Sequence, residues 1–199
     1  MSAKVNLLQR HLPEVIVRED RLSRIRYRVQ QFLDSLWPQV AQDERAILAL
    51  WLPPRAAKLF LQMPRRDQRH SLNVFYTLRS AGHEHPDLLA AALLHDVGKS
   101  LYEGRRLHLW HRVAIVLLEA VAPAWLNKIS ALGSQPKSLW HPFYIHVRHP
   151  ELGAALALNA GCSKLTAALI RRHQDPLRAA PVSQEDRLLA ALQAADDLN

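Results

Sequence analysis

Apolar and polar residues along this chain recur with the period of an α-helix, about 3.6 residues. The pattern is clear in residues 21–37, where arginine and glutamine separate the apolar positions. These positions are Leu22, Ile25, Val29, Phe32, Leu33 and Leu36. No segment shows the two-residue alternation that is typical of a half-buried β-strand. The pattern therefore predicts an all-α fold.

Prolines and glycines set the expected helix boundaries. Helices are predicted over residues 21–37, 43–52, 54–64, 66–81, 87–95, 107–121, 150–160, 163–173 and 183–198. Gly82 is expected to cap the helix before it, and Ser183 with Asp186 forms a variant of the capping box. Residues 122–148, with their prolines and aromatic side chains, are expected to be the least regular stretch.

The composition is that of a globular protein. The 199 residues are 49% apolar and 22% charged, and this length suits one ordinary domain. The single cysteine, Cys162, excludes an internal disulfide and fits a reducing compartment. The N-terminus carries no secretory signal, and no apolar run approaches the roughly 20 residues that span a bilayer. We therefore expect a cytoplasmic location and no membrane partner.

The chain is strongly basic, with a net charge of +8 and a pI near 10.1. Its arginines are dispersed through the sequence, and no Lys/Arg block or aromatic-interleaved recognition motif occurs. This distribution favours surface ion pairing first and an anionic substrate or partner second. A nucleic-acid partner is compatible with the charge but is not favoured.

The segment Ala92-Leu-Leu-His95-Asp96-Val-Gly98-Lys99 is the most informative part of the sequence for function. An apolar helix ends there in two adjacent metal-binding side chains, followed by a glycine for a sharp turn and by a lysine. A buried aspartate is costly unless a cation compensates it, and imidazole with carboxylate suits a divalent ion. A helix cap beside a hydrogen-bonded core histidine explains the His-Asp pair equally well.

Helical phase identifies further inward-facing side chains. His70 and His173 each share a helix face with apolar residues. Asp196 shares its face with three leucines, whereas Asp197 shares one with polar residues and is expected to be solvated. His149 directly precedes Pro150, and this position alone favours an ordinary helix-start residue over a ligand.

The segment from His95 to Lys99, with His70 before it and Asp196 after it, resembles the HD superfamily of metal-dependent phosphohydrolases. The resemblance covers residues 66–199, which it identifies as an HD-type helical bundle behind an N-terminal helical extension, residues 1–65. It implies that His70, His95, Asp96 and Asp196 hold a primary divalent ion.

The string His149-Pro150-Glu151-Leu152-Gly153-Ala154, followed by His173, resembles the binuclear branch of that superfamily. It implies that His149 and His173 hold a second ion, with Asp96 bridging the pair; His146 is the main rival for the role of His149. No Gly-Tyr-Pro follows the His-Asp segment, so the resemblance does not extend to cyclic-di-GMP as substrate.

The resemblance implies hydrolysis of a nucleotide or another small phosphate ester by a metal-activated water. Asp96 and Lys99 become the expected catalytic residues, and Lys99, Arg148 and Arg172 the expected phosphate contacts, although solvated arginines fit equally well. The expected cofactors are two divalent ions, whose identity stays open among Fe, Mn, Zn, Ni, Co and Mg. The alternatives are a non-catalytic module that binds a ligand or nucleic acid and, less favoured, a di-iron oxygenase-type protein.

Overall fold

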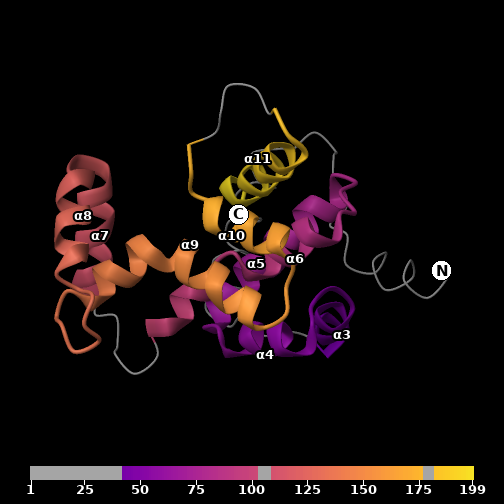
Figure 1. Cartoon of the computed structure of the whole chain (residues 1–199), viewed down its shortest axis with the longest axis horizontal. Helices are drawn as coiled ribbons and strands as arrows, with labels where there is room; N and C mark the ends of the chain where they lie inside the picture. The colour runs from indigo at the N-terminus through magenta and orange to yellow at the C-terminus, as the bar shows by residue number, and fades with distance from the viewer. Residues whose placement is uncertain (1–41, 103–108, 177–181) are drawn as a thin grey trace, which may run out of the picture.

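The computed structural model describes residues 42–102, 109–176 and 182–199 (Figure 1). All secondary structure in these residues is helical, which confirms the all-α prediction. The elements are α3 (Gln42–Trp51), α4 (Pro54–Gln62), α5 (Arg65–Ser80), α6 (Pro86–Leu94), the 3-10 helix η1 (Val97–Tyr102), α7 (Leu109–Val121), α8 (Pro123–Ala131), α9 (His141–Asn159), α10 (Lys164–Arg172) and α11 (Gln184–Asp197). The helix predicted over residues 21–37 lies outside the described residues.

Helix α6 forms the centre of the main body. Its residues from Leu88 to Leu94 are all buried, because they are leucine and alanine and the helix packs against α3, α4, α5, α10 and α11. Burying one leucine contributes about 1.5–3 kcal/mol, so this segment is a major source of stability. The same burial fixes the position of the two residues that follow α6, His95 and Asp96.

Two sequence-predicted end signals are confirmed. Gly82 follows α5 with a φ of +84°, and the backbone N–H of His83 returns to the carbonyl of Leu78 at 3.0 Å, as in a Schellman cap. At the start of α11, Ser183 Oγ accepts from the Asp186 N–H at 3.0 Å while the Asp186 carboxylate accepts from the Ser183 N–H at 3.2 Å.

The prediction of an irregular segment over residues 122–148 is wrong. That segment contains α8 and the beginning of α9, since Pro123 and Pro142 occupy the first turns of these helices, where a missing N–H costs nothing. The predicted helix start at residue 150 is wrong as well, because α9 continues through Pro150. Pro150 is buried within α9, and its missing N–H leaves one carbonyl of the helix without its usual donor.

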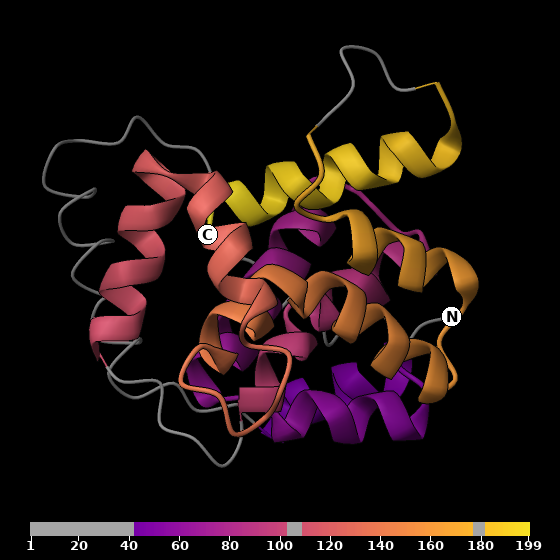
Figure 2. The same cartoon turned by 60° about the vertical axis from the view of Figure 1, so that its left-hand side comes forward.

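Helices α7 and α8 pack on each other and on the N-terminal half of α9, and they stand to one side of the main body (Figures 1 and 2). Their interior is a small separate cluster built on Ile115, Leu126 and Phe143. Helix α9 runs from this cluster into the main body, where it packs against α10 and η1. We call α7 and α8 together, residues 109–131, the α7–α8 hairpin.

Helices α3 and α4 share the main core with the helices of the expected domain, through apolar side chains such as Leu48 and Phe60. An ion pair reinforces the packing: the guanidinium of Arg69 on α5 donates to both carboxylate oxygens of Glu44 on α3, at 2.6 and 2.8 Å. Only 3% of the Glu44 side chain is exposed. The domain boundary placed at residue 65 remains a prediction.

Replacing Glu44 by glutamine is expected to destabilise the fold by about 2–3 kcal/mol, because it removes a buried negative charge that accepts two hydrogen bonds from the Arg69 guanidinium. Urea unfolding measures this difference. Glu84→Gln is the matched control, since the Glu84 carboxylate pairs with Arg79 on the surface and its loss costs under about 1 kcal/mol. If both variants lowered the free energy of unfolding by the same amount, the buried Glu44–Arg69 pair would stabilise the fold no more than the surface pair does.

Candidate metal centre

Six side chains that lie far apart in the sequence meet on one side of α6. His70 comes from α5 and Asp196 from α11; His95 and Asp96 follow α6; His149 lies in α9 and His173 follows α10. They form two groups whose ligand atoms lie within 4.8 Å of one another. We call His70, His95 and Asp196 the first triad, and Asp96, His149 and His173 the second triad.

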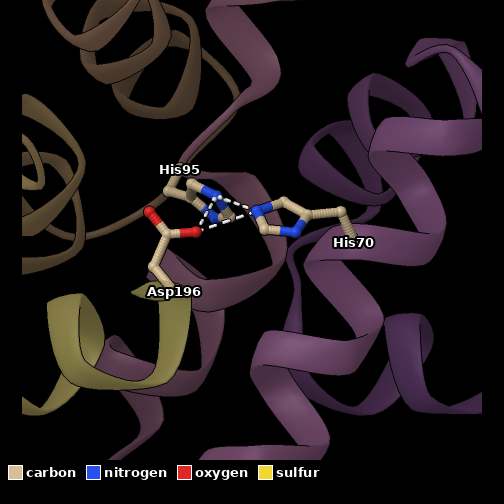
Figure 3. Close-up of side chains that lie close together, drawn as sticks. All are labelled: His70, His95 and Asp196. Carbon is tan, nitrogen blue, oxygen red and sulfur yellow. Dashed lines mark hydrogen bonds and ion pairs between the residues drawn. The ribbon is translucent and has the colours of Figure 1, made fainter. Parts of the chain in front are cut away.

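In the first triad, two imidazoles and a carboxylate point toward one another (Figure 3). The Nε2 atom of His70 lies 2.8 Å from Oδ1 of Asp196 and 3.3 Å from Nε2 of His95. His95 is buried, whereas the side chains of His70 and Asp196 are each 28% exposed. The first triad therefore opens to solvent on the side formed by α5 and α11.

The second triad is buried throughout. Nε2 of His149 lies 3.4 Å from Nε2 of His173 and 3.5 Å from Oδ1 of Asp96. The other carboxylate oxygen of Asp96, Oδ2, lies 3.7 Å from Nε2 of His95 in the first triad. The Asp96 carboxylate thus presents one oxygen to each triad, which is the placement that a bridging ligand requires.

Three of the imidazoles are oriented by the same device. The Nδ1 atoms of His95, His149 and His173 lie 3.0, 2.6 and 2.7 Å from the carbonyl oxygen three residues earlier in the chain. A carbonyl oxygen only accepts, so each Nδ1 carries the hydrogen, and in the neutral ring Nε2 is left with its lone pair. Backbone partners of this kind are typical of metal-binding histidines.

Each accepting carbonyl lies where the helix leaves it without its usual partner. His95 and His173 are the C-cap residues of α6 and α10, and the last carbonyls of a helix have no intrahelical donor. His149 lies inside α9, but there Pro150 has no N–H to give to the carbonyl of His146. The Nδ1–H of His149 donates to the carbonyl of His146 instead. The side chain of the rival ligand, His146, pairs with Glu119 at 2.9 Å.

The donor set fits divalent metal ions. Burial, followed by the charge of His95, lowers the pKa of His173 to about 3, so this imidazole is neutral at physiological pH. The Nε2 atoms of His149 and His173 face each other across 3.4 Å in a buried site, and the Nδ1 atom of each ring already has a backbone carbonyl as its partner. Ligand nitrogens held about 2.1 Å from one ion lie about 3–3.4 Å apart. A cation shared by the two nitrogens satisfies both, and imidazole with carboxylate suits Zn²⁺, Mn²⁺ or Fe²⁺.

Both carboxylates stay ionised in this site. Burial by itself would raise the pKa of Asp96, but His95, His149 and Lys99 outweigh it and hold the pKa well below its usual range. Burial also opposes ionisation of Asp196, and the hydrogen bonds from His70 and His95 again lower its pKa. The centre therefore offers two negative charges to bound cations at neutral pH.

The three expected phosphate contacts lie in different surroundings. Lys99 is at the centre, with its Nζ atom 2.7 Å from Oδ2 of Asp96. The Arg148 side chain is exposed and contacts Glu151, and Arg172 contacts the carboxylates of Glu185 and Asp186 at 2.5 and 3.1 Å. The structure brings Lys99 to the triads and gives the two arginines carboxylate partners elsewhere, so their contact with phosphate stays a prediction.

Sequence analysis overlooked Asp67, which lies one helical turn before His70 on α5. Burial and then the negative charge of Asp96 raise the pKa of its carboxyl group, and Lys99 acts on it in the opposite sense. Asp67 is therefore an additional acidic group in the electrostatic field of the centre. The signal available in the sequence was its spacing of three residues from His70, which places both on one helix face.

The comparison with known protein families agrees with this geometry. The model of the HD domain family matches residues 68–199. No curated protein and no solved structure matches the chain. The matched residues include both triads and Lys99, and they make up about two-thirds of the chain. The chain therefore belongs to the HD domain family.

Proposed function

We propose that this chain is a metal-dependent phosphohydrolase that acts on a nucleotide or another small phosphate ester. The observation that carries the proposal is the position of Asp96, whose two oxygens face the two triads while Lys99 donates to one of them. Such an arrangement supports two ions, one in each triad, with the Asp96 carboxylate between them. Members of the HD domain family are commonly metal-dependent phosphohydrolases, which agrees with it.

The exposure of the two triads indicates where a substrate would approach. The first triad is partly open and the second is buried, so a phosphate ester would reach the centre along the side of His70 and Asp196. Divalent ions bound here would lower the pKa of a bound water towards about 7 and stabilise charge on the phosphoryl oxygens. The carboxylates of Asp96 and Asp196, whose pKa values are lowered, would hold the ions in their anionic form.

Lys99 is suited to neutralise the phosphoryl group. Its side chain is 30% exposed and reaches the centre from η1, where its ammonium group donates to Asp96 Oδ2. A phosphate oxygen is an equally good acceptor for the Lys99 ammonium group, because the phosphate and the Asp96 carboxylate are both anionic. We propose that Lys99 donates to a non-bridging phosphoryl oxygen and that this interaction strengthens as negative charge develops there.

Lys99→Met is expected to lower kcat/KM for a phosphate ester by about a hundredfold, because it removes a charged donor from the reacting group. Metal content should stay at the wild-type value, since Lys99 is not among the ligand atoms of either triad. Lys164→Met on α10 is the control for loss of a lysine outside the centre. An unchanged kcat/KM in Lys99→Met would contradict the assigned role.

The proposal itself is tested by metal analysis combined with a panel of nucleotides and simple phosphate esters. We expect two equivalents of a divalent ion, and phosphate release that chelation abolishes and added metal restores. Stoichiometric iron with no phosphate release from any ester would instead favour oxygen-dependent di-iron chemistry. Binding of RNA or DNA that persists in His95→Ala, again with no turnover, would favour a binding module.

A further inference from the structure

The outer face of α7 is apolar and uncovered in the part of the chain that the structure describes. Trp110, Val113, Val116, Leu117 and Val121 are each more than half exposed. Their spacing places them along one side of the helix. The opposite side of α7 packs into the small cluster of the α7–α8 hairpin. Helix α7 is thus apolar on both sides, and among the described residues only one of these sides has a partner.

The exposed apolar surface continues beyond α7. Trp125 on α8 is 63% exposed, and Leu132 and Trp140 in the turn that follows α8 are also exposed. Nine of the 14 exposed large apolar side chains in the described residues fall between residues 110 and 140. Isolated exposed leucines are normal, but a concentration of this kind marks a surface that binds something apolar.

The charges around this surface are mainly positive. Among the described side chains of residues 109–140, Lys128 and Lys137 are basic and Glu119 is acidic. The Glu119 carboxylate pairs with His146, and the Lys128 ammonium lies 5.4 Å from the centre of the Trp125 ring. The whole chain carries +8. An occupant of this surface should therefore be apolar and negatively charged.

We propose that the α7–α8 hairpin docks on the surface of a bilayer that contains anionic lipids. Tryptophan rings favour the interface between headgroups and acyl chains, and lysines beside them reach back to the headgroups. A second copy of the chain fits less well, because it would bring another +8 against the same face. The described residues contain no helix that is long and apolar enough to cross a membrane.

This mode of binding differs from the one that the sequence argued against. The expectation of no membrane partner rested on the lack of a spanning segment, whereas a helix that lies in the interface needs one apolar face and basic flanks. The apolar face of α7 becomes visible only when the fold shows which side of the helix is covered. The proposal is independent of the reaction proposed for the metal centre.

The test is co-sedimentation of the full chain with vesicles of phosphatidylcholine, with and without phosphatidylglycerol, at physiological ionic strength. We expect pelleting with the anionic vesicles and a shift of tryptophan emission to shorter wavelength. Val116→Glu combined with Leu117→Glu should weaken this binding by at least about tenfold. Leu50→Glu combined with Leu61→Glu is the matched control, since it adds the same charge at exposed positions of α3 and α4 and should bind as the wild type does.

Three outcomes of this experiment would overturn the proposal. Failure of the wild-type chain to pellet would do so directly. Equal weakening in both double variants would show that general positive charge, and not the hairpin, attracts the vesicles. A wild-type dimer that binds no vesicles and that the hairpin variant separates into monomers would make a second copy the occupant. Circular dichroism and urea unfolding of both variants establish that each is folded.

Discussion

Asp96→Asn should reduce phosphate-ester hydrolysis by roughly a thousandfold or more, because it removes the anionic charge placed between the two triads. The amide keeps the shape of the carboxylate but offers one oxygen instead of two. We therefore expect metal content to fall from two equivalents to one or none. Metal analysis and steady-state kinetics on the same preparation measure both effects.

Asp197→Asn provides the control for this experiment. Asp197 is exposed at the end of α11, so its replacement makes the same chemical change away from the ligand atoms and should leave activity and metal content unaltered. The variant His149→Ala distinguishes the two triads. It should lose one equivalent of metal, since His149 belongs only to the second triad. Full metal occupancy in Asp96→Asn would rule out the bridging role.

Gly98→Ala should have the largest effect on stability, a loss of more than about 3 kcal/mol. A Cβ atom at Gly98 would lie 2.1 Å from the backbone oxygen of His149 and 2.9 Å from the backbone nitrogen of Gly153. Both are backbone atoms in α9 that no side-chain rotation can move away. Because η1 and α9 would be forced apart, Asp96 and His149 would separate, and we expect metal binding to weaken in urea-unfolding and metal-titration experiments.

Gly82→Ala is the informative comparison for that variant. Gly82 has a positive φ but open space around its Cβ position, so alanine there should cost only about 1–2 kcal/mol of backbone strain and leave metal binding intact. If the two alanine variants had equal stability and metal affinity, the close approach at Gly98 would not matter. The sequence suggested a sharp turn for Gly98, but Gly98 has no positive φ, and contact with α9 is what excludes a side chain.

The sequence-based predictions succeeded where local periodicity carries the information. Helical phase distinguishes Asp196, which contacts His70, from its exposed neighbour Asp197. It also directs His70 and His173 toward the interior. The local pattern cannot show which of these side chains meet, because that depends on how α5, α9 and α11 pack. The family resemblance, and not the local pattern, implied a bridging position for Asp96, and the fold places its Oδ2 near His95 and its Oδ1 near His149 and His173.

Prolines explain most of the errors. Residues 122–148 were expected to be irregular partly because of their prolines, but Pro123 and Pro142 lie in the first turns of helices, and Pro150, which was expected to start a helix, lies inside α9. The arginines were harder for another reason: Arg172 is adjacent to His173 in sequence, yet its guanidinium turns toward α11, where Glu185 and Asp186 bind it. Proximity in sequence does not determine the direction of a long side chain.

Pro150 connects the regularity of α9 with the geometry of the metal centre. An ordinary residue at this position would donate its N–H to the carbonyl of His146 and make the helix more regular. The same carbonyl holds the ring of His149 through Nδ1 at 2.6 Å. The backbone and the imidazole would then compete for one acceptor, and a stiffer helix would leave a looser ligand. A local defect in the helix is, at this position, the source of order in the side chain.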